Sequence, residues 1–135
     1  MAGLAEKMIV DYFESKDITP EVLDGYFRVG WNIEGTSIDV FFVIDDDDSH
    51  AHLRGLNFVK IPESKFEKMY QVVNALNDEY NWVKFIVDVE HETIAARDDA
   101  VIHLDSCGEE CYELMMRMVG IVQEEYPEIM KAMWA

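Results

Sequence analysis

The sequence is poor in basic residues, with 11 Lys and Arg against 28 Asp and Glu in a chain of 135 residues. Its formal net charge of -17 creates a field that repels phosphate backbones and anionic lipid surfaces. We therefore expect no nucleic acid and no membrane as partner. Solubility is the simpler explanation of so many carboxylates, and a basic partner protein is the alternative.

Cysteine and long apolar runs are also scarce. The chain has two cysteines, and acidic residues interrupt its N-terminal apolar positions at helical spacing, unlike a secretory signal. No apolar run reaches the length that a membrane span requires. These features predict a cytoplasmic protein with reduced thiols.

Catalytic motifs are missing as well. The sequence contains no GxGxxG, no GK[ST] phosphate loop, no HExxH and no GxSxG, and its glycines are scattered singly. Most carboxylates fall on faces that we expect to be exposed, which is ordinary surface composition. We therefore expect neither an enzyme nor a cofactor.

Hydrophobic residues make up 50% of the chain, enough for one domain with a substantial core over residues 1–135. Helical and strand periodicities predict the element order α-β-β-β-α-β-β-α. This order favours an α+β fold, with an antiparallel sheet of about five strands and helices packed against it. The expected elements are a helix over 4–16, strands over 26–33, 38–44 and 52–61, a helix over 62–80, strands over 82–89 and 92–102, and a helix from 106.

Local signals mark where several of these elements begin and end. Ser64 with Glu67, and Ser106 with Glu109, have the spacing of capping boxes. Pro127 is expected to break or restart the last helix. Asn77, in the segment VNALN, is expected to bind backbone groups in the turn to the next strand, as is Asn74.

The stretch FVKIPESKFEKMYQVVNALNDEYNWVKFIVDVEHETIAARDDAVI resembles the YbjN family of small bacterial domains, described as sensory transduction regulators. It combines a strand, a proline-started helix with VNALN, the strand KFIVD and a charged strand. Residues 1 to 45 agree in pattern only. The resemblance implies a fold similar to that of type III secretion chaperones and a regulatory role, but no catalytic residue.

The segment IDDDDSHAHL offers ligands for a metal ion, namely Asp45, Asp46, Asp47, Asp48, His50 and His52. Carboxylates suit Ca²⁺ or Mn²⁺, and imidazoles suit softer ions. The spacing fits no standard site, because an EF-hand loop would need glycine at position 50 and glutamate at position 56. A solvated hairpin turn is the preferred interpretation, and a metal-responsive sensor is the alternative.

The segment HLDSCGEEC is a second candidate metal site, through His103, Cys107 and Cys111 near Asp105. Three residues separate the two cysteines, whereas a zinc knuckle has two between them. This spacing favours packing on one helix face. A helix start would also lower the pKa of Cys107 and make its thiol reactive.

Several elements have more apolar residues than one buried face requires, which suggests a surface that binds other proteins. Strands 38–44 and 52–61 are apolar on both faces, and the last helix is rich in methionine. We therefore predict a homodimer and a regulatory or chaperone-like domain that captures an unidentified protein partner. The candidate binding residues are Phe41, Leu56, Phe58, Met115, Met116, Met118, Met133 and Trp134.

Overall fold

The structure is a computed structural model that describes residues 3–135. Three α-helices and six strands follow one another, with a short 3-10 turn over Glu63–Lys65 before the second helix. The elements are α1 (Leu4–Ser15), β1 (Glu21–Leu23), β2 (Tyr26–Ile33), β3 (Thr36–Ile44), β4 (His50–Leu56), α2 (Phe66–Glu79), β5 (Lys84–Asp88), β6 (Thr93–Val101) and α3 (Cys107–Trp134).

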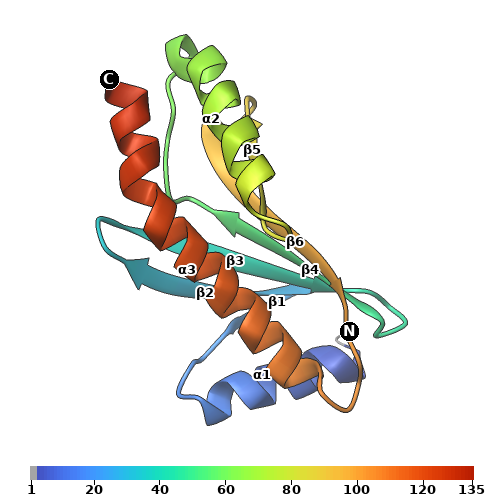
Figure 1. Cartoon of the computed structure of the whole chain (residues 1–135). Coiled ribbons are helices and arrows are strands. Elements are labelled where there is room, and N and C mark those ends of the chain that lie inside the picture. The colour runs from blue at the N-terminus through green and yellow to red at the C-terminus, as the bar shows by residue number, and fades with distance from the viewer. Residues whose placement is uncertain (1–2) are drawn as a thin grey trace.

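The six strands form one antiparallel sheet in the order β1-β2-β3-β4-β6-β5. All three helices lie on the same side of this sheet, where α3 crosses the strands diagonally and α1 and α2 flank it (Figure 1). The predicted α+β class and element order are confirmed. The prediction missed only β1, a three-residue edge strand inside the expected connector. No helix in the described part of the chain is long and apolar enough to cross a membrane.

Alternation along the strands divides the sheet into a covered face and an open face. In β3, Ile38, Val40 and Phe42 are fully buried under the helices, whereas their neighbours point the other way. Phe42 stacks on Phe27 of β2 at 4.6 Å between ring centroids, and Phe13 of α1 meets Phe42 edge-on at 5.6 Å. These rings attach α1 to the centre of the sheet.

Two glycines allow α3 to approach its neighbours closely. A Cβ on Gly55 would lie 2.9 Å from both Met118 Sδ and Ile38 Cδ1, so the absent side chain leaves room for α3 against β4. A Cβ on Gly108 would lie 2.5 Å from Tyr12 Cβ. The contact between α1 and α3 therefore requires glycine at position 108.

The junction between α2 and β5 depends on Asn77. Its Oδ1 accepts a hydrogen bond from the backbone N–H of Phe85 at 2.7 Å, and its Nδ2 donates to the Phe85 carbonyl at 2.9 Å. The predicted role of Asn77 is confirmed. Asn74 is exposed on α2, and no hydrogen bond of its side chain occurs among residues 3–135, so the same prediction for Asn74 is wrong.

The predicted capping boxes are also wrong. Neither helix start has a side-chain cap: α2 begins at Phe66, after the 3-10 turn, and the Ser106 side chain does not cap α3. Glu110 instead binds the preceding loop, accepting a hydrogen bond from the backbone N–H of His103 at 2.7 Å.

Pro127 does not end α3, contrary to the sequence-based expectation, and the helix continues to Trp134. Proline removes one backbone hydrogen bond from a helix interior. Beyond it, however, Ile129 and Met133 are 0% and 1% exposed, and burial on this scale is worth several kcal/mol by area. Packing of the last turns therefore outweighs the local loss.

Candidate protein-binding surface

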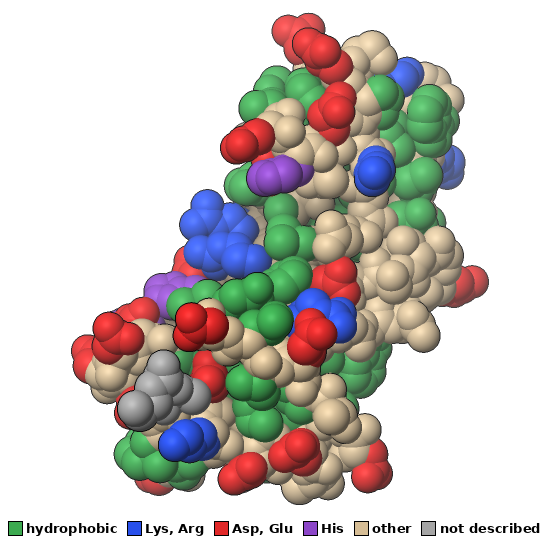
Figure 2. Space-filling view, turned by 180° about the vertical axis from the view of Figure 1, so that it is seen from behind, with side chains coloured by type: hydrophobic (Ala, Val, Ile, Leu, Met, Phe, Trp, Pro, Cys, Tyr) green, Lys and Arg blue, Asp and Glu red, His purple; other side chains and the backbone are tan. Residues whose placement is uncertain are grey.

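The helices leave the open face of the sheet uncovered, on the side opposite to α3 (Figures 1 and 2). Alternate residues of each strand point to it. Phe41 of β3 and Leu56 of β4, two predicted binding residues, lie there and are half-buried. Val43 and Ile86, on the same face, are 43% and 38% exposed.

Basic side chains cross the middle of this face in a single register row. Arg28 of β2 is paired with Phe41, Phe41 with Arg54 of β4, Arg54 with Arg97 of β6, and Arg97 with Lys84 of β5. Figure 2 shows Lys and Arg side chains beside a band of hydrophobic ones, with acidic side chains around them. Four of the chain's 11 basic residues therefore share one row.

The cations in this row differ in how they are neutralised. Arg28 pairs with Asp39 at 2.7 Å and Glu21 at 3.1 Å, and Arg54 pairs with Asp99 at 2.9 Å. Lys84 Nζ donates to two backbone carbonyls at the end of α2, those of Asn77 at 2.9 Å and Tyr80 at 2.5 Å. Arg97 is exposed and forms no ion pair with any residue in 3–135. The positive charge is thus least compensated at Arg97 on β6, whereas Lys84 on β5 is bound to carbonyls but has no carboxylate partner among the described residues.

Four of the predicted binding residues are almost fully buried. Met115, Met118, Met133 and Phe58 are between 0% and 2% exposed and belong to the core under the helices, although Phe58 and Met133 also line a groove beside Trp134. Methionine in α3 fills the space between helix and sheet, the simpler of the roles this residue type can have. Met116 is partly buried against the same core.

Trp134, the last predicted binding residue, is 63% exposed at the end of α3. It borders a groove of about 370 Å³ that Tyr126 and Met130 also line. The Lys65 ammonium lies 5.7 Å from the centroid of its indole ring. This groove is a second apolar surface, on the helical side of the molecule.

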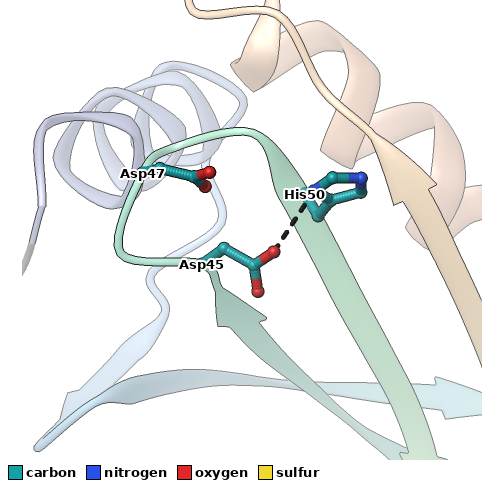
Figure 3. A group of neighbouring side chains, drawn as sticks. All are labelled: Asp45, Asp47 and His50. Carbon is teal, nitrogen blue, oxygen red and sulfur yellow. Dashed lines mark ion pairs between the residues drawn. The ribbon is translucent and has the colours of Figure 1, made fainter.

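The Asp/His segment forms the turn between β3 and β4, as the hairpin interpretation predicts (Figure 3). Potential ligand atoms of Asp45, Asp47 and His50 all lie within 4.8 Å of one another. Local contacts already hold these side chains: Asp47 accepts hydrogen bonds from Ser49, which lower the pKa of its carboxyl. Asp48 is not part of this group of ligand atoms. Its Oδ1 accepts a hydrogen bond from the backbone N–H of Ala5, at the start of α1, at 3.3 Å.

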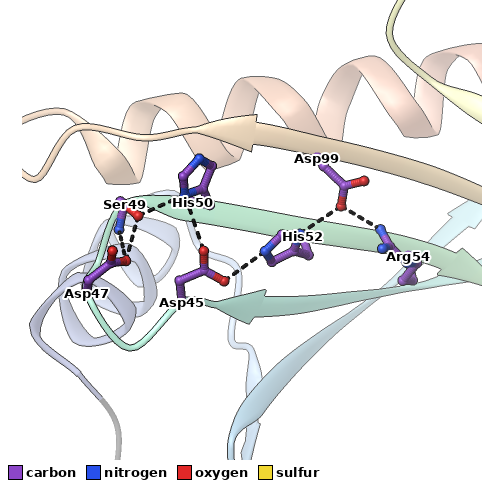
Figure 4. A network of polar contacts seen from close by, with 7 residues as sticks. All are labelled: Asp45, Asp47, Ser49, His50, His52, Arg54 and Asp99. Carbon is purple, nitrogen blue, oxygen red and sulfur yellow. Dashed lines mark hydrogen bonds and ion pairs between the residues drawn. The ribbon is translucent and has the colours of Figure 1, made fainter.

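His52 extends this turn into a polar network on the open face (Figure 4). Its Nε2 lies 2.8 Å from Asp45 Oδ1, and its Nδ1 lies 2.8 Å from Asp99 Oδ1. Asp99 also accepts a hydrogen bond from Arg54. The bond to Asp99, and then that to Asp45, raise the pKa of His52 against the opposing effect of burial. The network joins the turn, β4 and β6.

The second candidate metal site does not form among the described residues. Cys107 and Cys111 are both buried free thiols, which confirms packing. His103 Nδ1 lies 2.9 Å from Glu110 Oε2 rather than near the sulfurs. Burial raises the pKa of Cys107, and raises that of Cys111 to about 12, so the expected low pKa at the helix start is wrong.

The basic row and Asp99 were not among the residues singled out in the sequence. Each cation occupies an alternate position of its own strand, and this alternation was the available signal. Alternation along one strand predicts which face of the sheet a residue occupies. It does not predict which residues lie side by side on neighbouring strands, because that depends on how strands distant in sequence pair. Arg54 and Arg97, for example, come together only because β4 pairs with β6.

Comparison with protein families gives a match over residues 6–124 to the YbjN family, described as "Putative bacterial sensory transduction regulator". The resemblance seen in the sequence is thereby confirmed. No curated protein matches this chain.

Among solved structures, the chain is similar to "YbjN, a putative transcription regulator from E. coli". The two share 10% identity and superpose with a TM-score of 0.68, over 94% of this chain and 93% of the other. At this identity the similarity establishes the fold alone.

Proposed function

Because the chain belongs to the YbjN family, whose members are described as sensory transduction regulators, we propose that it is a non-catalytic regulatory domain that binds a protein partner. The binding surface in this proposal is the open face of the sheet. The role is regulatory or chaperone-like, and its setting is the cytoplasm.

The observation that supports this proposal is a sheet face that the described helices leave uncovered and that exposes apolar side chains among its charged ones. Val43 and Ile86 are 43% and 38% exposed there, and Phe41 and Leu56 contribute further apolar area. Large exposed apolar patches are typical of protein interaction sites. A partner segment laid across these side chains would remove them from water, a gain of roughly 25 cal/mol per Å² before the costs of association.

Capture from a lysate of the source cells, run in parallel with two variants, tests the proposal. Val43→Asp places a charge on the open face, and Tyr70→Asp places the same charge on α2, at a side chain of similar exposure, 48% against 43%. We expect a partner that the wild type and Tyr70→Asp retain and Val43→Asp loses. Equal recovery by both variants, at matched unfolding midpoints, would assign the binding elsewhere.

A metal-responsive sensor is the second candidate function, favoured by the grouping of Asp45, Asp47 and His50. In this proposal a cation bound at the turn would bias the adjoining open face. Calorimetric titration with Ca²⁺, Mn²⁺ and Zn²⁺ provides the test, together with melts in EDTA and in saturating ion. The sensor requires binding that Asp47→Asn weakens and a melt that the ion raises; silence for all three ions would exclude it.

A further inference from the structure

The row Arg54, Arg97 and Lys84 places three cations on adjacent strands, each directly opposite the next. Neighbouring strands lie about 4.8 Å apart, and like charges directly opposite each other destabilise a sheet. Among residues 3–135, the one ion pair of this row joins Arg54 to Asp99, which also contacts His52. The arrangement therefore costs stability, and a ligand that neutralises it would recover that cost.

Apolar side chains adjoin these cations on the β5 side. Trp82 is 67% exposed and Ile86 is 38% exposed. Together with Lys84 and Arg97 they line a surface hollow of about 330 Å³, which Asp98 and Asp99 also border. Asp98 is paired with Arg117, and Asp99 with Arg54 and His52. Neither carboxylate is therefore paired with Arg97, which has no ion pair among residues 3–135. A ligand that fits this hollow needs an apolar group against the indole and a carboxylate within reach of the guanidinium.

The charges around the row limit the kind of ligand further. With a net charge of -17, the chain repels a polyphosphate backbone. A two-fold dimer through this face would set the row of cations against its own copy. Acidic Asp39 and Asp88 lie farther along the same face, so a fitting ligand is acidic in its middle and neutral or basic at its ends.

We infer that the open face binds a protein segment in which one or two carboxylates lie between apolar side chains, with the carboxylates paired to Arg97 and Lys84. This inference rests on the proposed function and specifies the chemistry of the partner. Arginine pairs with carboxylates through two parallel hydrogen bonds, which fixes the register of the segment as well as its charge.

Selection of displayed random peptides on the immobilised protein tests this inference. We expect the wild type to enrich peptides with Asp or Glu between apolar residues. The double variant Lys84→Glu/Arg97→Glu should lose these peptides or select Lys and Arg instead. The matched control is Lys7→Glu/Lys131→Glu, which makes the same change of charge at exposed helical positions and should keep the wild-type preference.

A selected peptide should also bind Arg97→Glu at least about tenfold more weakly than wild type, the loss expected for one charge-assisted pair. Enrichment of apolar peptides without acidic residues would overturn the inference and leave protein capture in place. No enrichment over a bare surface would overturn the proposed function too.

Two further results would reassign the face. If the wild type is a dimer and the double variant a monomer, the open face binds a second copy of the chain. If a single-stranded oligonucleotide is retained only by the wild type, the open face binds nucleic acid. Either result overturns the inference.

Discussion

Asn77 joins the end of α2 to β5 by using both functions of one amide group. Its oxygen and nitrogen satisfy the backbone N–H and carbonyl of Phe85, whose side chain is 1% exposed. Lys84, the preceding residue, binds the backbone carbonyl of Asn77 in return. The position of β5, and with it the position of Lys84 on the open face, thus depends on a few polar contacts.

Replacing Asn77 by Ala should therefore lower the free energy of unfolding by about 1–3 kcal/mol, because two backbone groups lose their partners. Urea denaturation measures this loss. The control is Asn74→Ala, one helical turn away on the exposed side of α2, which should change stability by less than about 0.5 kcal/mol. Equal effects of the two substitutions would remove the role given to Asn77.

His52 makes stability depend on pH, since its two carboxylate contacts raise the pKa of its imidazole in the folded state. A raised pKa means that the folded protein binds the proton more tightly than the unfolded chain does. The resulting stabilisation is complete below the ordinary pKa near 6.5 and is lost as the pH rises through the raised value.

We accordingly expect His52→Gln to lose more stability at pH 6 than at pH 9, in a range where Asp99, whose pKa is lowered, stays ionised. Urea denaturation of wild type and variant at both pH values gives the comparison. A difference in stability that is the same at both would mean that His52 carries no proton-linked stabilisation.

At the scale of elements, α3 organises the molecule because it contacts α1, α2 and the sheet. Its length of 28 residues depends on contacts at both ends: Gly108 against Tyr12 near the start, and Ile129 and Met133 in the core beyond Pro127. Covering one face of the sheet with these helices leaves the other face free for a partner.

Two glycines of α3 should respond in opposite ways to the same substitution. Gly108→Ala forces a methyl group to within 2.5 Å of Tyr12 Cβ and should destabilise the protein by about 1–3 kcal/mol. Gly120→Ala meets nothing within 4 Å in the described structure and should stabilise it by about 0.5–1 kcal/mol, because alanine favours a helix. Thermal or urea unfolding distinguishes them. A shift of the same sign for both would contradict the close contact between α1 and α3.

At the scale of the whole molecule, charge is distributed unevenly. The chain carries a net charge of -17, yet its open face gathers four of the 11 basic residues in one row. Apolar side chains adjoin that row, so a partner meets apolar and cationic groups together, inside a surface that repels most anionic macromolecules. Partner chemistry, rather than affinity alone, would then decide what binds.

The predicted homodimer belongs to this scale too, and we expect it to form through the groove beside Trp134 rather than through the basic row. Light scattering at micromolar concentration should give twice the monomer mass for wild type and for Val43→Asp. Trp134→Lys should reduce that mass, since the exposed indole would then carry a charge at the interface. A wild-type monomer would contradict the prediction.

Periodicity was sufficient to predict the fold class and the element order, because helical and strand patterns of apolar residues can be recognised within short segments of sequence. It also assigned Phe41 to the outer face of β3. The prediction that Met115, Met118 and Met133 bind a partner failed, because the sequence pattern of an apolar helix residue is the same whether it packs on a sheet of its own chain or on a partner. The basic row could not be predicted, because it depends on which distant strands pair and in what register.

Site-specific photocrosslinking in the source cells tests most directly whether the open face binds a protein. Benzoylphenylalanine replaces Ile86 on the open face in one variant and Met8 on α1 in another, positions that are 38% and 37% exposed. We expect a discrete protein adduct from position 86 and none from position 8. An adduct from position 8 alone, or none from position 86, would contradict binding through the open face.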